Sequence, residues 1–424
     1  MAQDIEATRA RRVAELSRKI HAAMRGLGRS FALPHVEGNG NPCQPKRGKP
    51  TMNDYWYPCA FSHWGEEETS AIARVIASGR YTQGEEVGAF EEEFAVFHGM
   101  KHAIAVNSGS SANLVAVAAL FAKENNPLKR GDKAIVPALA WATTYAPLVQ
   151  YGLDLVLADC DGTWNAEQIM GQPLGTRLAV GCSILGNPAH LKHLAHAEYY
   201  INDNCESLGA WYGPLGEKKW TANFGLMSTH SFFWSHQLSA IEGGCILTDD
   251  DEMNSLCRML RDHGMTRWQK PQTFEEEYDF RLMGYNLRWV EMHAAIAREQ
   301  LKKLETMRRA REANWNNWEV MCRGLPIQIP PKLRNGVRSP FGLNFTVESK
   351  DARARLATSL RANGIDCRLP TGGSFRLHLY GAKWVDQETP NADRVHSCGL
   401  FLGNSPTDIS DKIERAVKVM RSVL

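Results

Sequence analysis

The segment from Ser231 to Gly244, SFFWSHQLSAIEGG, contains the first side chain that could do chemistry, His236. An imidazole has a pKa of about 6.5, so without further tuning a neutral ring can accept a proton near pH 7. The hydroxyls of Ser231 and Ser235 lie beside it in the sequence. A lone histidine among aromatic residues is also a common hydrogen-bonded core residue. The segment therefore indicates either a general base or a buried structural histidine.

A second candidate site is NSGSSANL, at residues 107–114. It follows a short apolar run and precedes a helical pattern, so Gly109 and Ser110 are expected at the first turn of a helix. Free backbone N–H groups and hydroxyls at such a turn bind anions, and a phosphate group fits this chemistry. The alternative is a helix that is only capped by serine.

A third candidate is Asp203, which ends the apolar run YYIND at residues 199–203. A carboxylate at the end of a buried strand needs a cationic partner or a solvated cleft, because burial of an unpaired charge is unfavourable. A protonated pyridine nitrogen is one such partner, and the pair would make the ring an electron sink. A helix N-cap is the alternative role.

These residues lie in a regular alternation of apolar runs and helical patterns, which predicts a doubly wound α/β sheet with mostly parallel strands. Ligands gather at the carboxyl ends of such strands. Beyond the large sheet, a long helix is expected at about 290–322, then a second alternating region with strands at 341–347 and 365–370. The strands of the large sheet are expected at residues 103–106, 134–137, 155–159, 178–185, 199–203, 224–227 and 245–250.

Three domains are expected from the same patterns. Residues 1–57 would form an N-terminal helix and an extended arm, because residues 28–57 are rich in Gly, Pro and Asn. Residues 58–300 would form the large α/β domain. Residues 301–424 would form a small C-terminal α/β domain with its connecting helix.

The composition indicates an ordinary soluble protein of 424 residues. Its 49 Lys and Arg nearly balance 47 Asp and Glu, so nothing favours nucleic-acid or membrane binding. No apolar run approaches the roughly 20 residues that span a bilayer, and no signal peptide is evident, so a cytoplasmic location is expected. The ten cysteines form no CxxC or CxC pair, so we expect no metal site and mostly buried thiols.

Six segments, read in chain order, carry a family resemblance: SGSSANL, VPALAWATTYAPLVQYGL, DNCESLGA, SFFWSHQLSAIEGG, MGYNLR and GIDCR. With them, the chain from about Tyr55 onward resembles the DegT-type sugar aminotransferase family, which acts on nucleotide-linked keto sugars. The resemblance implies the aspartate aminotransferase fold (fold type I) of pyridoxal 5'-phosphate (PLP) enzymes. It also implies a large cofactor domain, a small C-terminal domain, and a homodimer with shared active sites.

The resemblance assigns four residues to the phosphate of PLP, or of its amine form, pyridoxamine 5'-phosphate (PMP). Gly109 and Ser110 would hold the phosphate through the backbone and a hydroxyl, and Ser231 would add another donor. Asn286, in the GYN motif, would reach the phosphate bound in the neighbouring subunit.

Three further residues are assigned to the cofactor ring by the same resemblance. Trp141 would stack on the ring, and Asp203 would pair with the ring nitrogen. Glu206 would lie close enough to touch the ring substituents.

His236 departs from the family pattern, because the aminotransferases have a Schiff-base lysine at this position. Histidine replaces that lysine in a 3-dehydratase branch used in colitose synthesis, which acts on GDP-4-keto-6-deoxymannose and which the chain resembles best. The resemblance therefore implies a PLP/PMP-dependent lyase that removes the C3 hydroxyl of a 4-keto sugar. His236 would be the base and L-glutamate the amino donor.

A second histidine-bearing branch acts on CDP-linked sugars and adds an iron–sulfur cluster and a reductase partner. That branch has several cysteines after the EGG motif, whereas residues 262–286 of this chain have none. We therefore expect no cluster and no reductase, although the long N-terminal arm resembles that branch.

Two other interpretations stay open. HQ in place of HH after Ser235, together with the arm, is compatible with a same-mechanism dehydratase or aminotransferase acting on a nucleoside keto sugar in nucleoside antibiotic biosynthesis. A non-catalytic PLP-binding scaffold is a different class, although a scaffold has no use for an electron sink at Asp203. Arg368, in GIDCRLP, is either a ligand for an anionic group or a surface arginine.

Overall fold

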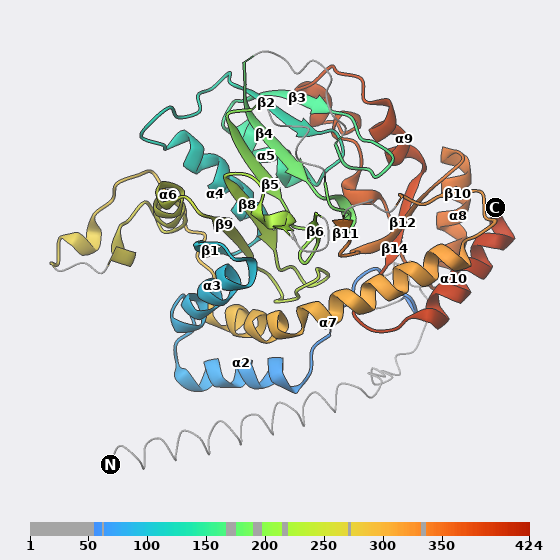
Figure 1. Cartoon of the computed structure of the whole chain (residues 1–424), viewed down its shortest axis with the longest axis horizontal. Helices are drawn as coiled ribbons and strands as arrows, with labels where there is room; N and C mark the ends of the chain where they lie inside the picture. Colours follow the sequence, from blue (N-terminus) through green and yellow to red (C-terminus); the bar gives the residue numbers. More distant parts are fainter. Residues whose placement is uncertain are drawn as a thin grey trace, which may run out of the picture.

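The computed structural model describes residues 55–61, 63–166, 175–189, 197–213, 219–269, 273–331 and 336–424. The N-terminal helix predicted from residue 3, and the arm as far as residue 54, lie outside these ranges. Two larger sheets lie side by side in Figure 1, and the long helix α7 (Glu291–Met321) runs along both of them.

The larger sheet has seven strands in the order β1, β9, β8, β5, β4, β2 and β3. β8, β5, β4, β2 and β3 pair in parallel, whereas β9 runs opposite to its neighbours β1 and β8. The predicted doubly wound, mostly parallel sheet is therefore confirmed. The strands are β1 (His102–Val106), β2 (Lys133–Pro137), β3 (Asp154–Ala158), β4 (Thr176–Cys182), β5 (Tyr199–Asp203), β8 (Met227–Ser231) and β9 (Gly244–Thr248).

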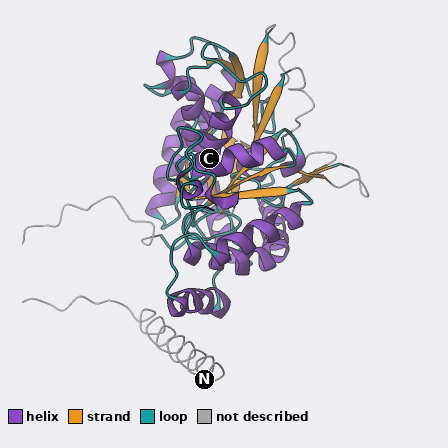
Figure 2. Cartoon of the chain, turned by 90° about the vertical axis from the view of Figure 1, so that its left-hand side faces the viewer, coloured by secondary structure: helices purple, strands orange, loops and turns teal. Residues whose placement is uncertain are grey.

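Helices cover both faces of this sheet, as Figure 2 shows. Successive residues of β1 point to opposite faces of the sheet. Ile104 belongs to the apolar cluster that contains residues of α4, whereas Ala103 and Ala105 belong to the cluster that contains residues of α3 and α7. A sheet with two apolar faces must be covered on both. The helices of this region are α2 (Glu66–Ser78), α3 (Glu85–His98), α4 (Gly109–Phe121), α5 (Ala142–Gln150) and α6 (Asp251–Arg261).

The C-terminal region forms a four-stranded antiparallel sheet in the order β10, β12, β14 and β13. Two strands were expected here, and the structure has both, although β14 has no counterpart in the prediction. Its elements are β10 (Ile327–Gln328), β12 (Gly342–Val347), α8 (Lys350–Ala362), β13 (Cys367–Arg368), α9 (Pro390–Cys398), β14 (Gly399–Gly403) and α10 (Ser410–Val423). A short third sheet contains β6 (Trp211–Tyr212), β7 (Lys219–Trp220) and β11 (Gly336–Val337).

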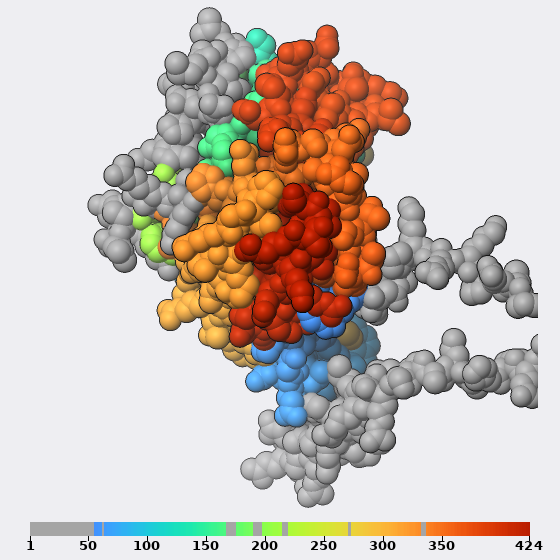
Figure 3. Space-filling view, turned by 90° about the vertical axis from the view of Figure 1, so that its right-hand side faces the viewer, coloured from blue at the N-terminus to red at the C-terminus, as the bar shows by residue number. Residues whose placement is uncertain are grey.

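The first described residues pack on the C-terminal region. Tyr57 forms a parallel bridge with Ile365, and its hydroxyl donates to the carbonyl of Gly403 at 2.7 Å. Figure 3 shows these early residues (blue) against the C-terminal residues (red). In chain order, therefore, the first described residues contact the small sheet, and the strands of the large sheet follow them. The expected boundary at residue 300 falls inside α7, and the domain limits stay predictions.

The cysteines of the described ranges are reduced and mostly buried. Nine cysteines are described, all with free thiols, and every one except Cys205 is buried, which confirms the expectation of mostly buried thiols. Within the described ranges, no helix is both long enough and apolar enough to cross a membrane.

Candidate active site

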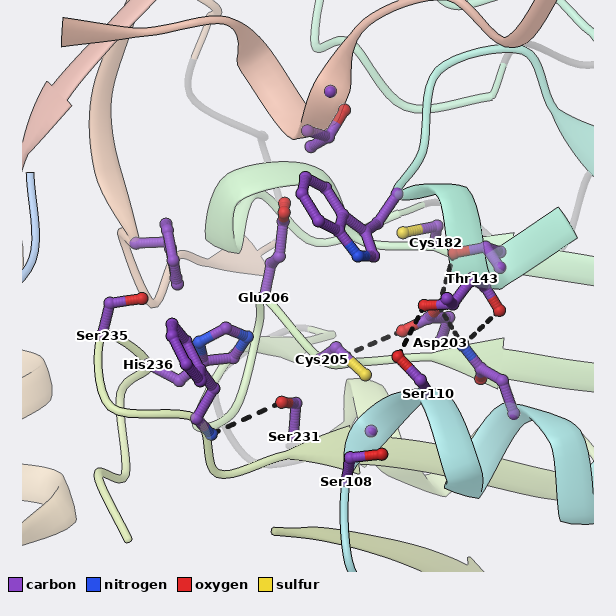
Figure 4. Close-up of a pocket in the computed structure, with 18 of the residues that line it drawn as sticks. Ser108, Ser110, Thr143, Cys182, Asp203, Cys205, Glu206, Ser231, Ser235 and His236 are labelled. Carbon is purple, nitrogen blue, oxygen red and sulfur yellow. Dashed lines mark hydrogen bonds between the residues drawn. The ribbon is translucent and has the colours of Figure 1, made fainter. Parts of the chain in front are cut away.

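A cavity of about 360 Å³ opens at the carboxyl ends of the parallel strands. Most of the predicted site residues meet in it, as Figure 4 shows for several of them. Asn286 is different: it is exposed, lies in a bridge with Asp262 and does not line the cavity, so its contact with a neighbouring subunit stays a prediction. The predicted residues that line the cavity are Gly109, Ser110, Trp141, Asp203, Glu206, Ser231 and His236.

The first turn of α4 forms one end of the cavity. Ser108 caps this helix, because its Oγ accepts the N–H of Ser111 at 3.1 Å, so the capping interpretation is correct for Ser108. The N–H groups of Gly109 and Ser110 lie in the same first turn and have no partner within the helix. A Cβ atom at position 109 would lie 2.6 Å from Cβ of Ser231, so only glycine fits. Backbone amides and hydroxyls therefore converge on a space that suits a phosphate.

Asp203 is the last residue of β5 and is only 3% exposed. Its Oδ2 accepts the Asn113 amide at 2.9 Å and the Thr144 hydroxyl at 2.8 Å, and its Oδ1 accepts the N–H of Cys205 at 3.1 Å. The described residues that follow Asp203 directly, 204–213, contain turns and the short strand β6 but no helix, so the N-cap alternative is wrong. The three donors are neutral, so they orient the carboxylate without neutralising it. The arrangement fits a cationic ligand group such as a protonated ring nitrogen.

Glu206 follows on the same loop, and its Oε2 accepts the N–H of Leu185 at 2.8 Å. Leu185 has φ of +48°, an uncommon backbone conformation for leucine that directs this N–H toward the carboxyl. Burial raises the pKa of Glu206 to about 8, the N–H of Leu185 opposes the rise, and the charge of Asp203 adds to it. The carboxyl is therefore neutral at pH 7 in the ligand-free protein.

Glu206→Gln is expected to stabilise the ligand-free protein at high pH only. Because the folded-state pKa is raised from 4.5 to about 8, the stability contributed by Glu206 is complete below pH 4.5 and is lost as the pH rises toward 8. The variant should melt about 2 °C or more above the wild type at pH 9, with a small difference at pH 5. Thermal melts across this range check it, with Glu92→Gln, at an exposed position of α3, as the control. An equal gain at both pH values would contradict the assignment.

His236 lies on the loop that joins β8 to β9, whose ends are held together by the pairing of Ser231 with Gly244. Its ring meets Phe341 edge to face at a centroid distance of 5.0 Å, and Phe233 at 5.9 Å. Nδ1 is buried and has no hydrogen-bond partner, so Nε2 is the nitrogen left open to the cavity. The structure therefore does not support the hydrogen-bonded core role.

The acidity of His236 differs from the sequence expectation. Burial, and next the positive charge of Arg311, lower the pKa of His236 to about 3. The expectation of an untuned imidazole was wrong, because Phe341 and Arg311 come from distant parts of the chain. The ring is still neutral at pH 7, as a proton acceptor must be.

The small-domain side of the cavity was missed by sequence reasoning, apart from Arg368. Thr371 is buried, has φ of +44°, and its Oγ1 has no partner, and Gly372 faces Trp141. Arg368 is the only lysine or arginine among the described residues that line the cavity. The wall therefore offers one cation for an anionic ligand group. The adjacent glycines at 372 and 373 are the only signal in the sequence that the backbone of this wall lies close to other side chains.

The strand-end cavity, the helix-turn amides and the buried carboxylate form the site of the aspartate aminotransferase fold of PLP enzymes. Residues 63–421 match the DegT/DnrJ/EryC1/StrS aminotransferase family. The chain therefore belongs to this family, and the resemblance seen in the sequence is confirmed.

Within the family, the chain is similar to proteins named as sugar 3-dehydratases. It is 36% identical over 390 residues to a GDP-4-keto-6-deoxy-D-mannose 3-dehydratase of Yersinia pseudotuberculosis, covering 86% of this chain and 98% of that protein. A solved structure of the E. coli enzyme with bound hydrated PLP has a TM-score of 0.80 at 35% identity, covering 86% of this chain and 99% of that one. A solved structure of a GDP-4-keto-6-deoxymannose 3-dehydratase with a trapped PLP-glutamate geminal diamine has the same TM-score of 0.80 and identity of 35%, covering 86% of this chain and 100% of that one.

Proposed function

We propose that this protein is a PLP/PMP-dependent lyase that removes the C3 hydroxyl of a 4-keto sugar linked to a nucleotide, of the GDP-4-keto-6-deoxymannose type. One observation carries the proposal: His236, and no lysine, lines the cavity from the loop that follows β8, in a family whose aminotransferases use lysine there. Similarity to named 3-dehydratases over 86% of the chain supports it. L-glutamate is the proposed amino donor, supported by the glutamate adduct in a similar structure.

The described residues fit the cofactor. The α4 turn at Gly109 and Ser110, with the hydroxyl of Ser231, would hold its phosphate, and the uncompensated carboxylate of Asp203 would hold its ring nitrogen. Trp141 stands at the start of α5 with 57% of its surface exposed, which leaves an indole face available for stacking.

When bound, the amine form of the cofactor supplies the nitrogen that joins C4 of the sugar and the ring that takes up electrons while the C3 hydroxyl departs. Nε2 of His236 is the proton acceptor, because it is the ring nitrogen open to the cavity. An anionic ligand in the same enclosed space raises the pKa of the imidazole and strengthens it as a base. Once protonated, the imidazolium is the acid for the departing hydroxyl.

The absence of lysine from the described lining of the cavity is part of the same proposal. A lysine amine would recapture the cofactor and help to return the amino group to the sugar. With histidine in its place, the nitrogen leaves as ammonia after hydrolysis and a 3-deoxy-4-keto sugar results. The homodimer with shared sites, the role of Asn286, the cytoplasmic location and the independence from a reductase remain predictions.

A second candidate is a same-mechanism enzyme for a nucleoside keto sugar, favoured by Gln237 in place of a second histidine. Purified protein should be incubated with PLP, L-glutamate and a panel of nucleotide-linked and nucleoside keto sugars. Mass spectrometry should find a product lighter than the GDP-linked sugar by one oxygen atom, because C3 carries hydrogen in place of its hydroxyl, with glutamate converted to 2-oxoglutarate and ammonia released. A product that keeps an amino group would contradict dehydration, and failure of glutamate to convert PLP to PMP would favour the scaffold interpretation.

A further inference from the structure

Gln237 follows His236 directly and is only 2% exposed. Its Nε2 donates to the backbone carbonyl of Glu206 at 2.6 Å and to that of Ser339 at 3.0 Å. With both amide hydrogens engaged, Oε1 is left buried and without a partner. Since both partners are carbonyl oxygens, the amide must present its NH₂ group to them.

The two carbonyls belong to different segments, of which one contributes Glu206 to the lining of the cavity and the other contributes Phe341. Glu206 lies on the loop after β5, with its carboxyl in the cavity (Figure 4). Ser339 lies in the segment that enters β12 of the small sheet, two residues before Phe341, whose ring packs edge-on against His236. One carboxamide therefore joins the loop of the base, the loop of the neighbouring acid and the small domain.

The segment that contains Ser339 is hydrogen-bonded to the loop after β4. The N–H of Ser339 donates to the carbonyl of Gly186 at 3.0 Å, and the N–H of Phe341 donates to the carbonyl of Leu185 at 3.1 Å. A Cβ at position 186 would lie 1.8 Å from the carbonyl oxygen of Ser339, so the two backbones touch. A shift of the segment at Ser339 would therefore displace Leu185, and with it the N–H that Leu185 donates to the carboxyl of Glu206.

We propose that Gln237 is a positioning residue, whose carboxamide fixes the imidazole of His236 relative to Glu206 and to the small-domain wall. The inference rests on the proposed role of His236 as the base. Misplacement of a reacting group by about 1 Å can cost about a hundredfold in rate, so a tether of this kind affects turnover more than ligand affinity.

Gln237→Met keeps the length of the side chain and removes both donors. The expected result, with the cofactor bound, is a kcat at least tenfold lower, with KM for the sugar changed less than threefold. The loosened imidazole becomes hydrated, so an acid limb near pH 6.5 appears in kcat/KM that the wild type lacks. Gln237→His, which can donate one N–H, should restore part of kcat.

Gln387→Met is the matched control. Gln387 also bonds a backbone, donating to the carbonyl of Leu157 at 2.7 Å and accepting its N–H at 2.9 Å, but it does not line the cavity. Its kcat and pH profile should match the wild type. A Gln237→Met enzyme within twofold of wild-type kcat, or one whose loss only follows loss of cofactor with an unchanged pH profile, would overturn the inference. His236→Asn separates the two proposals: full activity in that variant refutes the proposed base, whereas an inactive His236→Asn beside a normal Gln237→Met refutes only this inference.

Discussion

Replacement of His236 by lysine is expected to abolish dehydration and to leave the cofactor covalently attached to the protein. The new ε-amine would extend from the loop between β8 and β9 into the proposed cofactor cavity, where an amine reacts with the cofactor aldehyde. The exposed Nε2 acceptor would also be lost. The variant should keep its cofactor through desalting, whereas the wild type should release it.

Product analysis gives the second measurement for His236→Lys. With glutamate and the keto sugar, the variant should form an amino sugar, and the 3-deoxy product should fall at least a hundredfold, within the range that general acid–base catalysis contributes. His236→Asn is the control, since it removes the base without adding an amine: it should lose dehydration and still release the cofactor. Dehydration at the normal rate in His236→Asn would refute the role of His236 as base.

The large-domain half of the site could be predicted from the sequence because each of its parts is local. Asp203 ends an apolar run and Gly109 follows another; the two runs became β5 and β1, which point in the same direction in one sheet with β8 and β9 between them. Parallel strands bring their carboxyl ends to one edge, so residues far apart in sequence meet there without further information.

The remaining features depend on contacts that no local pattern encodes. The reversal of β9 turns the segment of His236 into a hairpin loop, although a long loop of this kind lacks the short turn signals that predict hairpins. The central strand β14 is a five-residue run, GLFLG, too short to be distinguished by periodicity. Thr371 and Phe341 complete the cavity only because the small sheet packs against the large one.

The pKa of His236 could not be predicted from the local sequence either. Its sequence neighbours include two serines and a glutamine, which suggest a polar setting. The low pKa arises from burial and from Arg311, on α7, whose own pKa burial lowers to about 10. Residue type and spacing thus indicated His236 as the proposed base, whereas tertiary packing determined the pKa of its imidazole.

Asp203→Asn is expected to lower kcat at least a hundredfold while the fold is retained. The amide has nearly the same shape, but it cannot supply the negative charge that would keep the ring nitrogen protonated. Loss of a buried, charge-assisted hydrogen bond of about 3 kcal/mol corresponds to a factor of about a hundred. Steady-state kinetics at saturating cofactor, with occupancy checked by absorbance, measure this effect.

The melting temperature of Asp203→Asn distinguishes a role in holding the ring nitrogen from a structural role of the carboxylate. In the cofactor-free protein, Asp203→Asn removes the cost of burying a charge, but its NH₂ group replaces one of the two oxygens that accept from Asn113, Thr144 and Cys205. The melting temperature should therefore fall by a few degrees at most. Thr144→Val is the matched control, because it removes one donor and keeps the charge, and its kcat should stay within about tenfold of the wild type. A normal kcat in Asp203→Asn at full occupancy would show that the ring nitrogen is held by another group. A fall in the melting temperature well beyond the cost of one mismatched donor would instead make the carboxylate a structural element.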